Sequence, residues 1–165
     1  MTNCFNLKYR FREYLGYLLI LGSVIGLDQY VKFLCRRDLR PVLTIDLWAG
    51  VFRLRYCENI GAAFSILEGK TWFFVIITLL FCGVIFFLLF SDRIRSNVGK
   101  IALLWVVAGG VGNLIDRLVF GYVTDMFDFY LINFAVFNVA DIFVCCGCIL
   151  FILVYIYTKG RVLAE

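Results

Sequence analysis

Four long apolar stretches dominate the pattern of hydrophobic and polar positions along the 165 residues. A helix needs about 20 apolar residues to cross the hydrocarbon core of a bilayer. Residues 71–90 meet this length without a charge, and residues 14–34, 98–117 and 134–158 do so with few charges. The pattern predicts an all-α membrane protein with four transmembrane helices, built as a single domain over residues 1–165.

The connection formed by residues 36–70 has a different pattern. Phe52-Arg53-Leu54-Arg55-Tyr56 alternates apolar and basic residues, which is typical of a half-buried strand. Pro41 favours a turn before this strand. We predict a small β-sheet in this first outer connection, with its apolar side on the bilayer or on the helix ends.

Composition supports the membrane assignment, because 63% of the residues are hydrophobic, 17% are charged and the mean hydropathy is +0.93. Soluble domains are about half apolar and about a quarter charged. A net charge of +4 without a basic, aromatic-rich run makes nucleic acid an unexpected partner. The chain has no histidine, which excludes Ser-His and Cys-His nucleophile pairs and leaves carboxylates as the most abundant catalytic candidates.

The seven cysteines do not resemble a disulfide framework. The spacing of Cys145 and Cys148 is C-x-x-C, but it lies in an apolar run without a second pair. We therefore interpret the cysteines as small buried hydrophobic residues that fill helix contacts, not as redox or metal ligands. They stand at positions 4, 35, 57, 82, 145, 146 and 148.

The distribution of basic residues predicts the orientation. The termini and the 91–100 connection carry eight Lys and Arg, and the opposite face carries six. The positive-inside rule therefore predicts cytoplasmic termini. Lys8, Arg10 and Arg12 before an apolar stretch resemble a secretory signal, but no small-x-small cleavage site follows, so we expect a retained first helix.

Four carboxylates are expected on one face of the membrane. Because chain direction alternates, the end of span 1, the end of span 3 and the start of span 4 lie on the same side. Asp28, Asp116 and Asp141 occupy these three places, and Asp125 lies in the short connection between spans 3 and 4. Ionisable groups near spans usually face a protein interior or a water-filled cavity.

Asn113 and Asp116 are spaced i, i+3 and therefore share one helix face, with Arg117 beside it. Asn138 and Asp141 have the same spacing at the start of span 4. The two pairs are expected to form two walls of one pocket. Small residues in span 3, namely Ala108, Gly109 and Gly112, would let another helix approach closely.

Two interpretations of these carboxylates are open. They could cap helix ends and pair with neighbours, as Asp116 could with Arg117. Alternatively, Asp125 and Asp141 have no local basic partner, and two such carboxylates brought together would share one proton and act as acid and base. Asp128 could replace either by geometry. A Ser-Lys pair, Ser23 or Ser65 with Lys32 or Lys70, has no supporting motif.

Three blocks of sequence carry a resemblance to a known family: RYCENIGAAFSIL at 55–67, GGVGNLIDRLVFGYVTDMFDFY at 109–130 and FNVAD at 137–141. Together with IGLDQYVK around Asp28, they resemble bacterial lipoprotein signal peptidase (signal peptidase II), an aspartic peptidase of the inner membrane. The resemblance implies removal of the signal peptide from diacylglyceryl-modified prolipoproteins, just before the lipidated cysteine. It implies contact with membrane lipid and a periplasmic active site, and it implies no metal or cofactor. We expect the chain to act as a monomer.

The resemblance also implies roles for individual residues. It makes Asp125 and Asp141 the catalytic pair, in preference to Asp128, and gives Asp28 a structural role. The remaining implied positions hold the substrate backbone (Asn59 and Arg117) or support the site (Asn113, Asp116 and Asn138). Segment 131–136 is shorter than the matching segment of many relatives, and this difference affects the expected shape of the flap near Asp141. The 36–70 sheet would clamp the substrate, and Gly61-Ala62-Ala63 would leave room for an extended chain.

Two other classes of function compete with the peptidase. A proton-coupled carrier would need carboxylates across the membrane, whereas spans 2 to 4 have none at mid-membrane or in their cytoplasmic halves. A non-enzymatic accessory subunit would use the glycine-rich faces to bind a larger complex.

Overall fold

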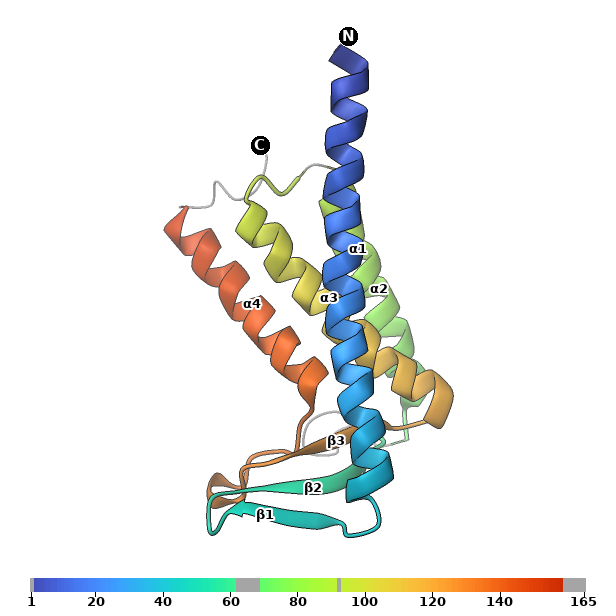
Figure 1. The fold of residues 1–165 in the computed structure, drawn as a ribbon, viewed down its shortest axis with the longest axis vertical. Helices are drawn as coiled ribbons and strands as arrows, with labels where there is room; N and C mark the ends of the chain where they lie inside the picture. The colour runs from blue at the N-terminus through green and yellow to red at the C-terminus, as the bar shows by residue number, and fades with distance from the viewer. Residues whose placement is uncertain (1, 62–68, 92, 159–165) are drawn as a thin grey trace.

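The computed structural model describes residues 2–61, 69–91 and 93–158, with side chains described from residue 10 onward. Within them, four helices are long and apolar enough to cross a membrane. Figure 1 shows these helices side by side, with the start of α1 and the end of α4 at one end of the bundle and a small sheet at the other. The helices are α1 (Thr2–Leu34), α2 (Thr71–Phe90), α3 (Asn97–Phe120) and α4 (Val139–Tyr157).

The predicted span 71–90 coincides with α2, whereas the other helix bounds differ from the prediction. The first helix is longer than residues 14–34, because it begins at Thr2 and continues beyond Leu34 as a π-helical turn, η1 (Cys35–Leu39). Ser96 caps the start of α3, and Gly121, with φ of 82°, ends it. The fourth helix begins at Val139 and not at residue 134, because Asn138 caps it.

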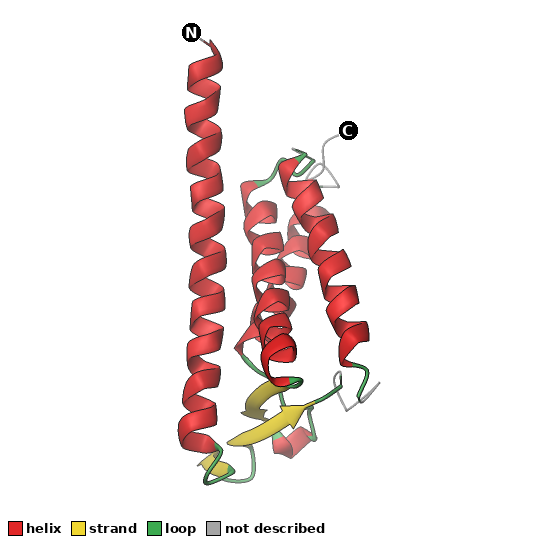
Figure 2. Ribbon diagram, turned by 90° about the vertical axis from the view of Figure 1, so that its right-hand side faces the viewer, coloured by secondary structure: helices red, strands yellow, loops and turns green. Residues whose placement is uncertain are grey.

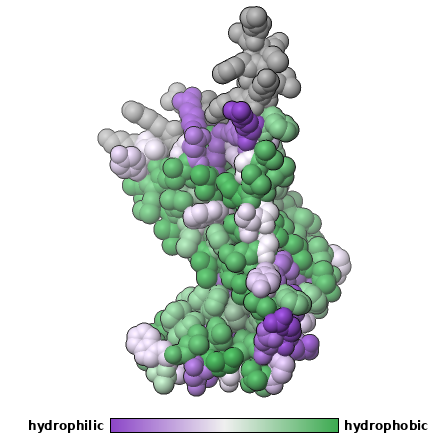
Figure 3. Space-filling view, viewed as in Figure 1, coloured by the Kyte–Doolittle hydropathy of each residue, from purple (hydrophilic) through white to green (hydrophobic). Residues whose placement is uncertain are grey.

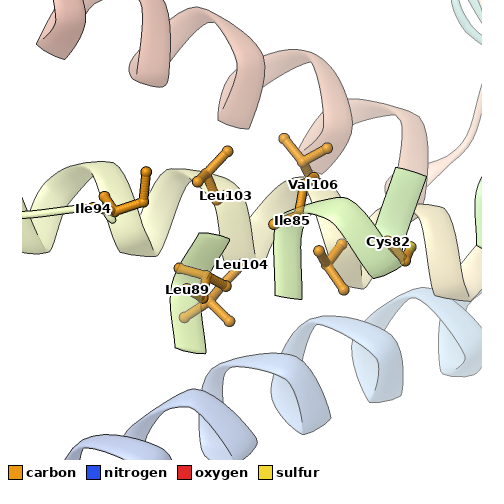
Figure 4. Close-up of a cluster of buried hydrophobic side chains, with 8 residues drawn as sticks. Cys82, Ile85, Leu89, Ile94, Leu103, Leu104 and Val106 are labelled. Carbon is orange, nitrogen blue, oxygen red and sulfur yellow. The ribbon is translucent and has the colours of Figure 1, made fainter. Parts of the chain in front are cut away.

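Helix α3 is the centre of the bundle and contacts the other three long helices. One hydrophobic cluster joins it to α2 and to Ile94 in the connection between them. Figure 4 shows Cys82, Ile85 and Leu89 of α2 facing side chains of α3. The outward faces of the other helices are apolar and exposed, and hydrophobic residues cover most of the middle of the molecule (Figure 3). This surface suits a lipid environment.

Glycines let α3 and α4 pack at close range, as the small residues in span 3 predicted. A Cβ on Gly109 would overlap the Ala140 carbonyl oxygen, and a Cβ on Gly147 would lie 2.6 Å from the Ala102 carbonyl oxygen. Any side chain at these positions would push the two helices apart. The close approach brings the polar end of α3 next to the first turn of α4.

The sheet is antiparallel, with the order β1-β2-β3. Strands β1 (Thr44–Trp48) and β2 (Phe52–Asn59) come from the first outer connection, as predicted. The third strand, β3 (Val123–Asp128), comes from the connection between α3 and α4 and was not predicted. Figure 2 shows the sheet beneath the helix ends. Leu54 and Tyr56 of β2 pack against the end of α1. Of the two predicted positions for the apolar side of the sheet, on the bilayer or on the helix ends, the structure therefore has the second.

The interpretation of the cysteines as buried residues is wrong for the C-x-x-C segment. Cys145, Cys146 and Cys148 are exposed, because α4 contacts α3 through Gly147 and turns these neighbours outward. Cys35 and Cys82 are buried as predicted, Cys57 is partly buried, and the side chain of Cys4 lies outside the described residues.

Candidate active site

A short backbone pairing brings β3 and the start of α4 together. Phe127 of β3 forms an isolated antiparallel bridge with Phe137. The Phe127 N–H donates to the Phe137 carbonyl oxygen at 2.9 Å, and the Phe137 N–H donates back at 3.1 Å. Asp125 lies two residues before one end of this bridge, and Asn138 follows the other end. The pairing therefore places Asp125 beside the N-terminus of α4.

Asp125 is nearly enclosed, with 2% of its surface exposed. Its Oδ2 accepts from Asn59 Nδ2 at 2.9 Å, and its Oδ1 accepts from Asn138 Nδ2 at 2.6 Å. Burial, followed by the negative charge of Asp141, raises the pKa of Asp125 from 3.8 to about 7. The two amides oppose this rise only in part, so Asp125 loses its proton near neutral pH and not in the acidic range of an ordinary carboxyl.

Asp141 occupies the third position of α4 and shares one of these residues, Asn138, with Asp125. Its Oδ2 accepts from the Asn138 backbone N–H at 3.1 Å, and the Asp141 N–H donates to Asn138 Oδ1 at 3.0 Å. This is a capping box, so the capping interpretation describes one role of Asp141. Its other oxygen, Oδ1, accepts from Asn113 Nδ2 at 2.7 Å. Asn138 thus contacts both aspartates at once.

A cavity of about 550 Å³ opens beside Asp141. Asn59, Asn113, Arg117 and Asp141 supply its polar lining. The apolar lining comes from the segment before α4, from α2 and from α4 itself: Phe74, Phe134, Ala135, Val136, Phe137, Ile142, Cys145 and Cys146. The segment 131–136 therefore contributes a wall of the cavity. Water and an extended apolar ligand both fit a cavity of this size and lining.

Arg117 closes one side of the cavity. Its Nη2 donates to the Gly61 carbonyl oxygen at 3.1 Å, and its guanidinium lies 4.9 Å from the centre of the Phe74 ring. The arginine therefore ties α3 to the end of β2 and to α2. Ala62 and Ala63, for which we predicted room for an extended chain, lie outside the described residues.

Asp116 does not use Arg117 as its partner. Its Oδ2 accepts from the Thr124 N–H at 2.9 Å, and its Oδ1 accepts from Gln29 Nε2 at 3.1 Å. Arg36 Nη1 lies 3.6 Å from the same carboxylate and donates to Thr124 Oγ1 at 2.9 Å. Asp116 therefore anchors the start of β3 at Thr124, the residue before Asp125.

Asp28 has a matching role at the start of α4. It is fully buried, and its Oδ1 accepts from the Ala140 backbone N–H at 2.9 Å. Its other oxygen packs so closely on α3 that a Cβ on Gly112 would lie 2.6 Å from it. Asp28 thus fixes the first turn of α4, which carries Asp141, against α1 and α3.

Sequence reasoning missed the position of Lys32. The Lys32 side chain is fully buried, 3.0 Å from Asp28 and 3.5 Å from Asp116, and it donates to Asn113 Oδ1 at 2.8 Å. The i, i+4 spacing to Asp28 is a signal for the first contact only. Ser23 is exposed on α1 and Ser65 lies outside the described residues, so Lys32 has no described serine partner.

Asp128, the geometric alternative to Asp125, lies in an ion pair. Its Oδ2 is 2.7 Å from Arg53 Nε and 3.7 Å from Arg55 Nη1. Arg53 is the register partner of Asp128 in the neighbouring strand, so the sheet itself sets this pair. Asp128 is therefore bound by arginines and not by the asparagine amides that bind Asp125. Among the described residues, no group of three or more Cys, Asp or Glu is placed to hold a metal ion.

The fold and the site together define a membrane protein with two amide-bound aspartates at the end of a helical bundle. Residues 20–157 match the family model described as signal peptidase (SPase) II. The match covers most of the chain, and the chain therefore belongs to the signal peptidase II family of aspartic peptidases.

Individual relatives agree with this assignment. The lipoprotein signal peptidase of Streptococcus thermophilus (strain CNRZ 1066) is 42% identical over 132 residues, covering 80% of this chain and 86% of the relative. That of Clostridioides difficile (strain 630) is 40% identical over 141 residues, covering 85% and 93%. A solved bacterial membrane enzyme, 27% identical, is similar with a TM-score of 0.80 over 91% of this chain and 93% of the other.

Proposed function

We propose that this chain is an aspartic endopeptidase that removes the signal peptide from prolipoproteins, with Asp125 and Asp141 as its catalytic pair. The supporting observation is that two carboxylates from different elements meet through Asn138, each bound by amide N–H groups. Family membership supports the reaction, and the geometry supports the choice of residues.

The raised pKa of Asp125 supports complementary roles for the two aspartates in this proposal. Asp141, which lines the cavity, takes a proton from water as the water oxygen attacks the scissile carbonyl carbon. Asp125 donates its proton to the carbonyl oxygen, so a neutral tetrahedral diol forms. When the C–N bond breaks, the proton on Asp141 passes to the amide nitrogen and a diol hydroxyl returns a proton to Asp125. Both aspartates end in their starting states.

The position of the cavity suits a lipid-anchored substrate. Its apolar wall includes Ile142 and Cys145 on the exposed face of α4, so an acyl chain or an apolar signal peptide enters from the bilayer. Cleavage then falls just before the diacylglyceryl-modified cysteine, where the peptide leaves the membrane. Arg117 and Asn59, at the polar side of the cavity, hold the substrate backbone.

In this proposal the site faces the periplasm and both termini are cytoplasmic, because the termini carry the larger number of basic residues. The enzyme acts as a monomer. The family assignment does not favour a proton-coupled carrier or an accessory subunit, the two competing classes.

The decisive experiment measures cleavage of a diacylated prolipoprotein by purified Asp125→Asn and Asp141→Asn variants. We expect each to lose at least about 10³-fold in kcat, because each removes one of two groups that act as a unit. Asp128→Asn is the matched control, since it changes a buried carboxylate three residues along the same strand.

Turnover within tenfold of the wild type by either Asp125→Asn or Asp141→Asn would exclude the proposed pair. Equal inactivation by Asp128→Asn, with the variant still folded, would refute the assignment of Asp125 over Asp128.

A further inference from the structure

The buried ammonium group of Lys32 has a contact that its ion pairs do not require. Lys32 lies on α1, and Asp28 and Asp116 already supply it with negative charge at 3.0 and 3.5 Å. Its shortest contact is to neither carboxylate but to Asn113 Oδ1, at 2.8 Å. Asn113 is the residue whose amide group binds Asp141.

This contact decides which way the Asn113 amide points. Asn113 Oδ1 accepts from two donors, Lys32 Nζ and Asn138 Nδ2, the latter at 3.1 Å. An ammonium group has three N–H donors and no acceptor, so it cannot face an amide NH₂. A flipped Asn113 would set its NH₂ against both donors. The amide is therefore held with Nδ2 toward Asp141 Oδ1, at 2.7 Å.

The orientation continues to the second aspartate. Because Asn113 presents its oxygen to Asn138, the Asn138 amide presents its NH₂ group, which also donates to Asp125 Oδ1 at 2.6 Å. Asn138 Oδ1 is left to accept from the Asp141 backbone N–H at 3.0 Å. One ammonium group thus orients two amides, and these amides donate to both aspartates.

We propose that Lys32 is a positioning residue of the reaction: it orients Asn113 and Asn138 toward the two aspartates and places a positive charge behind them. This inference rests on the proposed function. Lys32 does not touch the cavity, whose lining residues exclude it, so it acts through the two asparagines.

The charge of Lys32 has its own measurable consequence. Lys32 is one of the groups that oppose the rise in the pKa of Asp125. The ionisable groups around Asp125 from the other elements are Asp141 of α4, Arg117 of α3, Cys35 of η1 and Cys57 of β2. Removing the ammonium charge while these groups remain raises the pKa of Asp125. The alkaline limit, which is the pH above which activity falls as Asp125 loses its proton, therefore moves to higher pH.

The test uses Lys32→Met, which keeps an unbranched side chain one atom shorter than lysine and removes its charge. Because this change leaves Asp28 without its ion-pair partner, the double variant Lys32→Met with Asp28→Asn is measured alongside it. In the double variant, the charges of Lys32 and Asp28 are both removed. The charge of Asp116 remains, and Arg36 lies beside it as its counterion. Lys100→Met is the matched control, because Lys100 is also ion-paired, with Glu13, and lies near the start of α3, whereas Asn113 lies toward the end of that helix.

Cleavage kinetics are measured from pH 5 to pH 9 with a diacylated prolipoprotein. We expect both Lys32 variants to lose about 100-fold in kcat with KM changed less than threefold, as misplacement of catalytic groups predicts. Their alkaline limit moves to higher pH, whereas Lys100→Met retains wild-type kcat and pH dependence.

A folded double variant with wild-type kcat and an unmoved alkaline limit would overturn the role of Lys32. A loss of kcat without a shift of the alkaline limit would mean that Lys32 only stabilises the fold, and this result would also overturn its proposed role. These outcomes are separate from failure of the proposed function, which active Asp125→Asn or Asp141→Asn enzyme would reveal.

Discussion

Replacing Asp125 by Asn is expected to stabilise the fold at alkaline pH while it abolishes cleavage. The unfolded chain ionises this carboxyl near pH 3.8, whereas in the folded protein its pKa is about 7. Between these values the folded state binds more protons, so the free energy of unfolding falls as pH rises. The rise in pKa corresponds to about 4 kcal/mol once Asp125 is ionised in both states, and Asn removes this penalty.

The geometry of the site subtracts from this gain. Asn59 Nδ2 and Asn138 Nδ2 both donate to the Asp125 carboxylate, but an amide at this position has only one oxygen. Its NH₂ group would face the second donor, at a penalty of about 1–3 kcal/mol that does not depend on pH. We therefore expect a net stabilisation of about 1–3 kcal/mol at pH 8.

Unfolding of the purified protein in detergent, measured at pH 5 and pH 8, checks this balance. The stability of Asp125→Asn relative to wild type should improve by about 2–3 kcal/mol from pH 5 to pH 8. Asp128→Asn is the control, because Arg53 pairs with Asp128 at 2.7 Å and its loss destabilises the protein at both pH values. An Asp125→Asn effect that is equal at the two pH values would refute the reasoning.

Three further predictions follow from single features of the structure. Above pH of about 7, kcat/KM should fall about tenfold per pH unit as Asp125 loses its proton, and a level profile to pH 9 would contradict this role. Gly109→Ala should destabilise the protein by about 1–3 kcal/mol in an unfolding assay, whereas Gly83→Ala, which meets open space, should be neutral or stabilising. A substrate analogue should protect Cys145, which lines the cavity, from maleimide labelling followed by mass spectrometry, but should leave Cys148 reactive; equal protection of both would place the ligand elsewhere.

The helices could be predicted because apolar length is a local property of the chain. Helix α2 agrees with its predicted span residue for residue. The start of α4 could not be predicted in the same way, because Phe134, Ala135 and Val136 are apolar for another reason. They line the cavity, and Phe137 pairs with β3. An apolar run does not distinguish a wall of a site from a turn of a membrane helix.

Strand β3 shows a second limit of local patterns. Residues Val123–Asp128 alternate poorly, and two of the six are aspartates, which is typical of a loop. The strand forms because β2 and Phe137 pair with it on its two sides, and five of its six residues are buried. Both of its aspartates are buried, one bound by amides and the other by arginines.

The meeting of the carboxylates was predictable from the alternation of the spans alone. Asp28, Asp116, Asp125 and Asp141 do lie at one end of the bundle, linked through Lys32, Asn113 and Asn138. Their division into two kinds was not predictable, because it depends on which side chains meet across helices. Lys32 shares a helix with Asp28, but its contacts with Asp116 and Asn113 span more than eighty residues.

That division accounts for how the site combines stability with chemistry. Asp28 and Asp116 contact the cations of Lys32 and Arg36 and accept from the backbone N–H groups of Ala140 and Thr124, so these two aspartates hold α4 and β3 in place. Asp125 and Asp141 are bound by asparagine amides and backbone N–H groups. Neutral donors hold a carboxylate in position while allowing it to gain and lose a proton. In the proposed reaction, the charge of Lys32 therefore acts one residue further away from the two aspartates, through Asn113.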